Sequence, residues 1–131
     1  MNETLGLKSL NAPEIVRKFK HITGGYVNIG RDSKLMKEFL DKATPAQILY
    51  GIYQFRDAKT ITIPIFLRHH EEWLIEDEIE AEIELAALVS ETIHPSYMIW
   101  HDYRYDNNAY AVNQAETAFK ELVVWADRTL S

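Results

Sequence analysis

The chain of 131 residues contains no cysteine, which excludes disulfides, thiol catalysis and cysteine-ligated zinc. No run of about 18 apolar residues occurs, so we expect no membrane-spanning helix. Residues 1–10, MNETLGLKSL, carry an early acid and no apolar run, so we expect a loosely held leader and no signal peptide. The five glycines form neither GxGxxG nor GxxxxGK[ST], which excludes those nucleotide-binding loops. These absences predict a soluble intracellular protein without a nucleotide cofactor.

Charge is abundant but unevenly distributed, with 20 acidic and 14 basic residues and a net charge of −6. Ten basic residues lie between positions 17 and 68: Arg17, Lys18, Lys20, Arg31, Lys34, Lys37, Lys42, Arg56, Lys59 and Arg68. They could form a nucleic-acid patch with Tyr26, Tyr50 and Tyr53 as stacking partners. The chain is acidic overall, however, and most of these residues have acidic neighbours in sequence. We therefore expect no direct binding of nucleic acid.

Two amphipathic helices are predicted at the start of the chain. Asn11 and Glu14 form a capping-box pattern that begins the first helix, and Gly24-Gly25 ends it. Asp32 or Ser33 is expected to cap the second helix. Both segments place apolar residues three and four positions apart, which indicates one buried face on each helix.

A third helix is predicted to begin at Thr44-Pro45, where Gln47 completes another capping box. Gly51 lies inside this helix at a cost of about 1 kcal/mol relative to alanine, so we expect a neighbouring helix to approach closely there. Residues 60–63 alternate like a strand, but no second strand is evident, so we interpret them as an extended linker.

Residues 65–93 contain no proline or glycine and repeat apolar residues at helical spacing, which predicts a long acidic central helix. An unbroken helix would be about 44 Å long, so a bend between residues 73 and 76 is an alternative. His94-Pro95 is expected to end it. Residues 96–106, SYMIWHDYRYD, fit either a helix or an ordered aromatic loop. Asn107 or Asn108 then caps a last helix that ends near residue 129.

These elements predict an all-α fold, a single-domain helical bundle over residues 1–131. Its N-terminal helical module covers residues 11–73 and contains a three-helix unit. Residues 74–131 supply the long acidic helix, the aromatic segment and a C-terminal helix that folds back.

Catalytic, cofactor and metal sites are not expected. His69 and Glu72 stand three apart, but a carboxylate-bridged metal site needs such pairs from more than one helix. Glu91 and His94 form only a single separate pair. The sequence contains no G-x-S-x-G elbow, and its paired carboxylates have the spacing of a solvated helix face. We therefore expect a protein that is not an enzyme.

A surface for binding a protein partner is the favoured alternative. Tyrosine, tryptophan and arginine are the residue types that anchor protein interfaces. They cluster in the aromatic segment, while the acidic helix face offers a charged surface beside it. The same rings could instead cover the core. The predicted partner-binding residues are Tyr97, Trp100, Tyr103, Arg104, Tyr105, Glu76, Glu80 and Glu84.

The segment NIGRDSKLMKEFLDKATPAQILYGIYQF resembles a small helical module of bacteriophage-encoded proteins. That module begins with G-[RK]-D-x-K-L and continues with a helix opened by a [ST]-[PE]-x-[EQ]-[IL] cap. The matching positions are Gly30, Arg31, Asp32, Lys34, Leu35, Lys37, Leu40, Thr44, Pro45, Gln47 and Ile48. The resemblance covers residues 26–73 and includes residues 63–67 as the closing apolar segment. Residues 74–131 match nothing in the module.

Some proteins with this module resemble phage replication accessory proteins related to helicase loaders. The resemblance therefore implies a phage protein in the cytoplasm of the host cell. There it would bind a phage or host protein in DNA replication or host takeover. The alternative is a structural component of the virion, such as a helical connector or an accessory head protein. The sequence leaves a homo-oligomer open.

Overall fold

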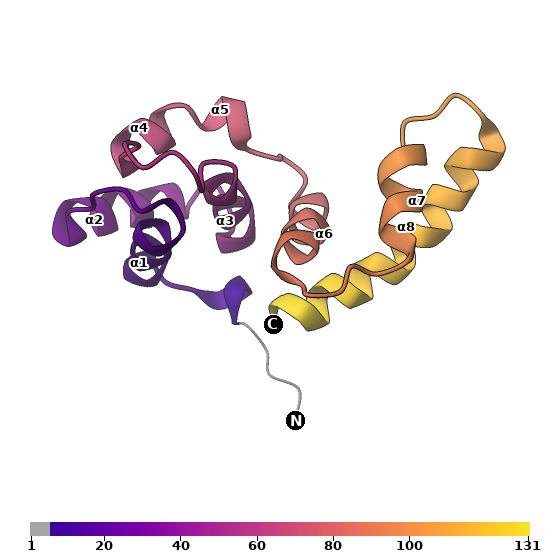
Figure 1. The fold of residues 1–131 in the computed structure, drawn as a ribbon, viewed down its shortest axis with the longest axis horizontal. Helices are drawn as coiled ribbons and strands as arrows, with labels where there is room; N and C mark the ends of the chain where they lie inside the picture. The colour runs from indigo at the N-terminus through magenta and orange to yellow at the C-terminus, as the bar shows by residue number, and fades with distance from the viewer. Residues whose placement is uncertain (1–5) are drawn as a thin grey trace.

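The computed structural model describes residues 6–131, and this part of the chain contains helices and no strands. The prediction of an all-α fold is confirmed. Eight α-helices and a short 3-10 helix follow one another within the described residues (Figure 1): η1 Leu7–Ser9, α1 Ala12–Thr23, α2 Ile29–Phe39, α3 Pro45–Tyr53, α4 Ile63–Arg68, α5 His70–Trp73, α6 Glu78–Val89, α7 Ser96–Tyr103 and α8 Ala109–Leu130. One contiguous cluster of buried apolar side chains runs from Leu7 to Leu130.

The predicted capping boxes are confirmed at α1 and α3. Asn11 and Glu14 exchange hydrogen bonds between side chain and backbone, as do Thr44 and Gln47. Gly24 ends α1 in the left-handed conformation with φ of 73°, which suits a residue without a Cβ.

The predicted cap of α2 is wrong. Asn28 caps this helix, because its side chain accepts a hydrogen bond from the backbone N–H of Arg31 at 3.0 Å. Asp32 instead lies inside the helix and is fully buried. Its Oδ2 accepts from the N–H of Asn28 at 2.8 Å, and its Oδ1 accepts from Nε of Arg31 at 2.9 Å. The helix therefore starts several residues earlier than the sequence indicates.

Gly51 is the contact point between α3 and α5. A Cβ added there would lie 2.1 Å from Cε3 of Trp73, so only glycine leaves room for the indole ring. The ring stacks on Phe66 with centroids 4.2 Å apart, and its Nε1 donates to the carbonyl of Phe66 at 2.8 Å. The close approach predicted at Gly51 is therefore confirmed.

The prediction of one long central helix is wrong, because residues 65–93 contribute to α4, α5 and α6. Trp73 is held against Gly51, and Leu74 then adopts an extended backbone. Nε2 of Gln47 donates to the carbonyls of Ile75 and Glu76 at 2.9 and 3.1 Å, and these bonds hold the two residues in the non-helical segment between α5 and α6. Asp77 caps α6, which ends at Val89. Residues 90–94 are non-helical, so the helix stops before His94-Pro95.

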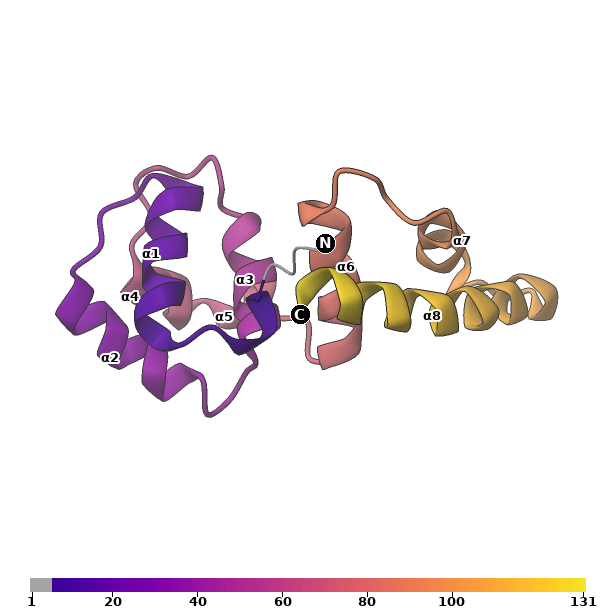
Figure 2. The same ribbon diagram turned by 90° about the horizontal axis from the view of Figure 1, so that it is seen from below.

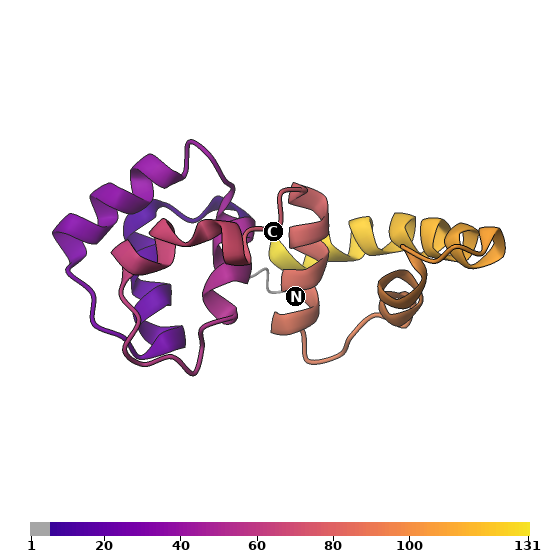
Figure 3. The same cartoon turned by 90° about the horizontal axis from the view of Figure 1, so that it is seen from above.

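The aromatic segment forms the helix α7, and α8 follows after a cap by Asn108. With 22 residues, α8 is about 33 Å long. Its second half packs on α6 through Leu122, Ala126 and Leu130, and its first half packs on α7. Figures 2 and 3 show this α7–α8 hairpin (residues 96–130) extending away from α1–α5.

Residues 6–10 are not a loose leader. Leu7 is buried, and the N–H of Gly6 donates to the carbonyl of Ser131 at 3.2 Å. Nζ of Lys8 lies 2.6 Å from Asp127 on α8 and 3.3 Å from Glu82 on α6. The start and the end of the described chain are thereby tied together. The leader predicted for residues 1–5 lies outside the described residues.

Candidate functional site

A groove runs between α6 and α7 and contains two hollows, of about 500 Å³ and about 290 Å³. We call it the α6–α7 groove. Along one side lie Glu80, Glu84 and Leu88 of α6, and along the other lie Arg104, Tyr97 and Ile93 in the opposite chain direction. Phe119, Ala115 and Val112 of α8 line the larger hollow, and Tyr50 and Gln54 extend the smaller one toward α3. The groove thus draws on α3, α6, α7 and α8.

A hydrogen bond between the two sides separates the hollows. The hydroxyl of Tyr97 donates to Oε1 of Glu84 at 2.5 Å. Burial raises the pKa of Tyr97 well above its usual range, and the bond to the Glu84 carboxylate raises it further. The pKa of Tyr50 is raised as well, first by burial and then by the charge of Glu84. Tyr97 therefore stays protonated at neutral pH and holds the buried carboxylate of Glu84 in place.

Arg104 is held at the larger hollow by two aromatic rings. Its guanidinium carbon lies 4.0 Å from the centroid of Trp100 and 4.9 Å from that of Tyr105, both cation–π distances. Its Nε and Nη1 are buried and have no acceptor among the described residues. Trp100 is itself buried against Phe119 of α8. The cation is therefore positioned by packing rather than by a carboxylate.

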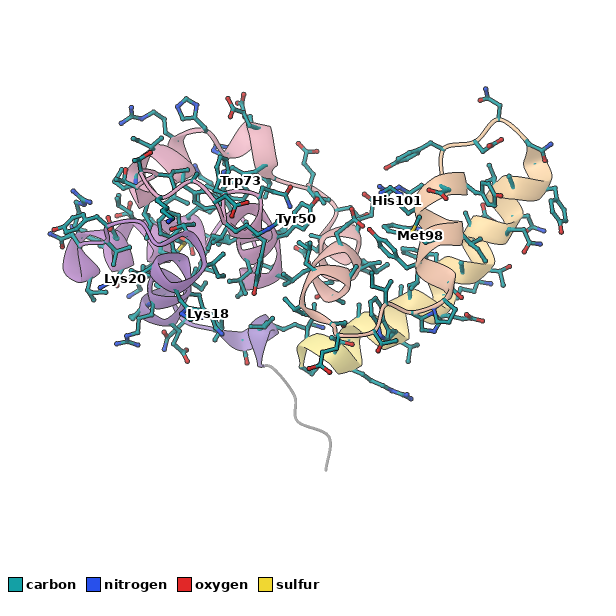
Figure 4. All side chains as sticks on the ribbon, in the orientation of Figure 1. Lys18, Lys20, Tyr50, Trp73, Met98 and His101 are labelled. Carbon is teal, nitrogen blue, oxygen red and sulfur yellow. The ribbon has the colours of Figure 1, made fainter. Side chains whose placement is uncertain are left out.

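Exposed apolar side chains border the smaller hollow. Leu88 is 41% exposed and Ile93 is 48% exposed. Met98, at 55%, lies on the flank of α7 nearer to α6, together with His101 (Figure 4). These three apolar side chains therefore remain open to solvent beside the groove.

The structure brings six of the eight predicted partner-binding residues together at this groove. Tyr97, Trp100, Arg104, Tyr105, Glu80 and Glu84 line one of its hollows. Trp100 and Glu84 are 3% and 9% exposed, so they support the groove and do not offer surface to a partner. Tyr103 and Glu76 are exposed but line neither hollow.

The residues that sequence reasoning missed come from other elements. Leu88, Ile93 and Phe119 line the groove, yet nothing in the sequence marks them as site residues. The sequence suggests Tyr50, which also lines it, only as a stacking partner for nucleic acid. Only the fold places them beside the aromatic segment. No local pattern distinguishes them from core residues.

The histidines do not converge. His69 lies 3.8 Å from Glu72, whereas His94 packs near Trp125 and His101 lies beside Asp102. The described part of the chain contains no group of three or more His, Asp or Glu side chains that could hold a metal ion. None of the helices between residues 6 and 131 is long and apolar enough to cross a membrane.

The opposite charges are segregated in space. Residues 69–131 contain 14 acidic and 3 basic residues. Lys8, Arg31 and their carboxylate partners account for every Lys or Arg ion pair among residues 6–131. In Figure 4, Lys18 and Lys20 lie at the far side of the molecule from Met98 and His101. The groove itself is lined by three carboxylates, Glu80, Glu84 and Glu116, and by three cations, Arg56, Arg104 and Lys120. Most of it lies in the acidic half of the chain.

The chain matches no protein-family model, no curated protein and no solved structure.

Proposed function

We propose that this protein acts without catalysis and binds a segment of another protein in the α6–α7 groove. The observation that carries the proposal is the open apolar strip beside two hollows, at the base of a hairpin that projects from the rest of the fold. Helices border the groove, and Arg104, Tyr97 and Tyr105 give it the residue types that anchor interfaces.

The resemblance of residues 26–73 to the phage module supports a setting for this binding. We propose that the partner is a phage or host protein in DNA replication or host takeover, in the cytoplasm of the host cell. The module-like helices α2 and α3 lie on the other side of α6 from the hairpin (Figure 1). The module would then serve as the scaffold, and the hairpin would supply the contact.

Affinity capture from infected cells tests the proposal. Tyr105 is 75% exposed at the larger hollow, and Tyr26 is 69% exposed on the loop between α1 and α2. Tyr105→Ser should weaken capture of the partner at least about tenfold, whereas Tyr26→Ser should leave it unchanged. Equal capture by the wild type and the folded Tyr105→Ser variant would reject the groove as the binding site.

A structural role in the virion is the second candidate, favoured by the projecting hairpin with Tyr103 and Tyr110 exposed on it. Such a component would assemble through symmetric contacts between copies. Light scattering separates the candidates, because a closed ring of copies would support the virion role. A monomer that captures a replication protein would support the first proposal.

A further inference from the structure

The α6 side of the groove is long enough for two turns of a bound helix to lie along it. This side extends over the nine residues from Glu80 to Leu88, a rise of about 12 Å, and two turns of an α-helix span about 11 Å. Helices α6 and α7 both pack on α8 but make few contacts with each other, so they form two walls over a floor. An amphipathic helix that binds such a groove inserts apolar residues three and four positions apart.

The two hollows follow one another along the groove. The larger one is lined by Val112, Ala115 and Phe119 at its apolar end, and the smaller one by Ala87, Leu88 and Ile93. The Glu84–Tyr97 hydrogen bond stands between them. A bound helix would therefore place one apolar side chain in each hollow, one or two turns apart.

Charge identifies the chemistry of the occupant. Glu80 lines the larger hollow and, like the neighbouring Glu76 and Glu78, forms no ion pair with any described residue. Glu116 adds a carboxylate from α8. Arg104 and Lys120 at this end and Arg56 at the smaller hollow balance the three carboxylates of the lining. Beyond the lining, 14 acidic residues against 3 basic ones in residues 69–131 leave the surrounding field negative. A negative field favours an occupant that carries Lys or Arg on its flanks.

We infer that the α6–α7 groove binds a basic amphipathic helix of the partner protein, an inference that rests on the proposed function. The apolar face of that helix lies between Leu88 and Tyr97, and its Lys or Arg residues run along the Glu80 side. Burial of apolar side chains and attraction between opposite charges therefore both contribute to the affinity, and added salt should weaken the second contribution.

A labelled peptide tests this directly by fluorescence anisotropy at about 0.15 M salt. The probe is a helix-forming peptide of about 14 residues with Leu at spacings of three and four and Lys on both flanks. We call it the Lys-flanked peptide. One control peptide replaces every Lys by Glu, and another carries a central Pro that prevents the helix. Only the Lys-flanked peptide should bind.

Two matched pairs of variants locate the site. Leu88 and Ile79 are both 41% exposed on α6, but only Leu88 lines the groove. Leu88→Ser should weaken binding about tenfold, while Ile79→Ser should change it less than about twofold. Glu80→Lys and Glu78→Lys reverse a charge in the same first turn, and only Glu80→Lys should weaken binding about tenfold.

Several results would overturn the inference. If both variants of a pair weaken peptide binding equally, the peptide binds outside the groove. If the Glu peptide binds as tightly as the Lys-flanked peptide, the occupant need not be basic. If the Pro peptide does so, the occupant need not be helical. If the protein mass doubles at high protein concentration, and Leu88→Ser but not Ile79→Ser prevents this, the groove binds a second copy of the chain. If no peptide binds while partner capture still depends on Tyr105, the inference fails and the proposed function stands. If no peptide binds and partner capture does not depend on Tyr105 either, both the inference and the proposed function are wrong.

Discussion

Gly51→Ala tests the packing that separates α5 from α6. In an open helix this change stabilises by about 1 kcal/mol. Here the new Cβ would lie 2.1, 2.5 and 2.8 Å from three atoms of Trp73, where about 3.5–4.0 Å is normal contact. The indole must tilt, which disturbs its stack on Phe66 and its hydrogen bond to the Phe66 carbonyl. Overpacking costs about 1–3 kcal/mol and an unpaired buried N–H a further ~1–3 kcal/mol. After subtracting the gain of about 1 kcal/mol in helix propensity, we expect a net loss of about 1–5 kcal/mol.

Thermal unfolding followed by circular dichroism measures this loss. Tm should fall by about 3–20 °C for a chain of this size. Gly30→Ala is the matched control, because an added Cβ there would meet only Asn28 Oδ1 at 3.8 Å, and it should be neutral or stabilising. In a Trp73→Ala background, Gly51→Ala should become neutral or stabilising, so a double-mutant cycle isolates the contact. A Gly51→Ala protein as stable as the wild type would refute this packing.

Three further predictions concern polar contacts. Lys8→Met should lower Tm near neutral pH, and less so in high salt. The hydrogen bond between Lys8 and Asp127 raises the pKa of Lys8 and lowers that of Asp127, so the loss should shrink below about pH 3.9 and above about pH 10.4. Tyr97→Phe should destabilise by about 1–3 kcal/mol, because buried Glu84 loses its donor. Burial raises the pKa of Tyr97, so absorbance titration should show a phenol that keeps its proton above pH 10, the usual tyrosine pKa. The stabilisation by Tyr97 should fade as the pH rises above that value. Asp32→Ala should lower the free energy of unfolding in urea by about 1–3 kcal/mol, while exposed Asp41→Ala should change it by less than about 0.5 kcal/mol.

Local signals predicted the helices well where one residue determines an end. The sequence shows the capping boxes at Asn11 and Thr44 and the helix end at Gly24, because each depends on residues within four positions of one another. The break between α5 and α6 has no such signal. It follows from the contact of Trp73 with Gly51 and from Gln47 bonding to Ile75 and Glu76, partners more than 20 positions apart.

The candidate site was predictable only in part for the same reason. The aromatic segment can be recognised from its composition, and the structure places it at the α6–α7 groove. Which rings face outward depends on α8, because Phe119 covers Trp100 and leaves Tyr105 exposed. Leu88 becomes part of the site only because α6 lies opposite α7.

An NMR titration of the isotope-labelled chain with the Lys-flanked peptide tests the central claim most directly. We expect the largest shifts at the amides of Ala87, Leu88, Tyr97 and His101, with those of Lys18 and Lys20 unchanged. Shifts centred on α1, or no shifts at peptide concentrations well above those of the protein, would contradict a partner-binding groove between α6 and α7.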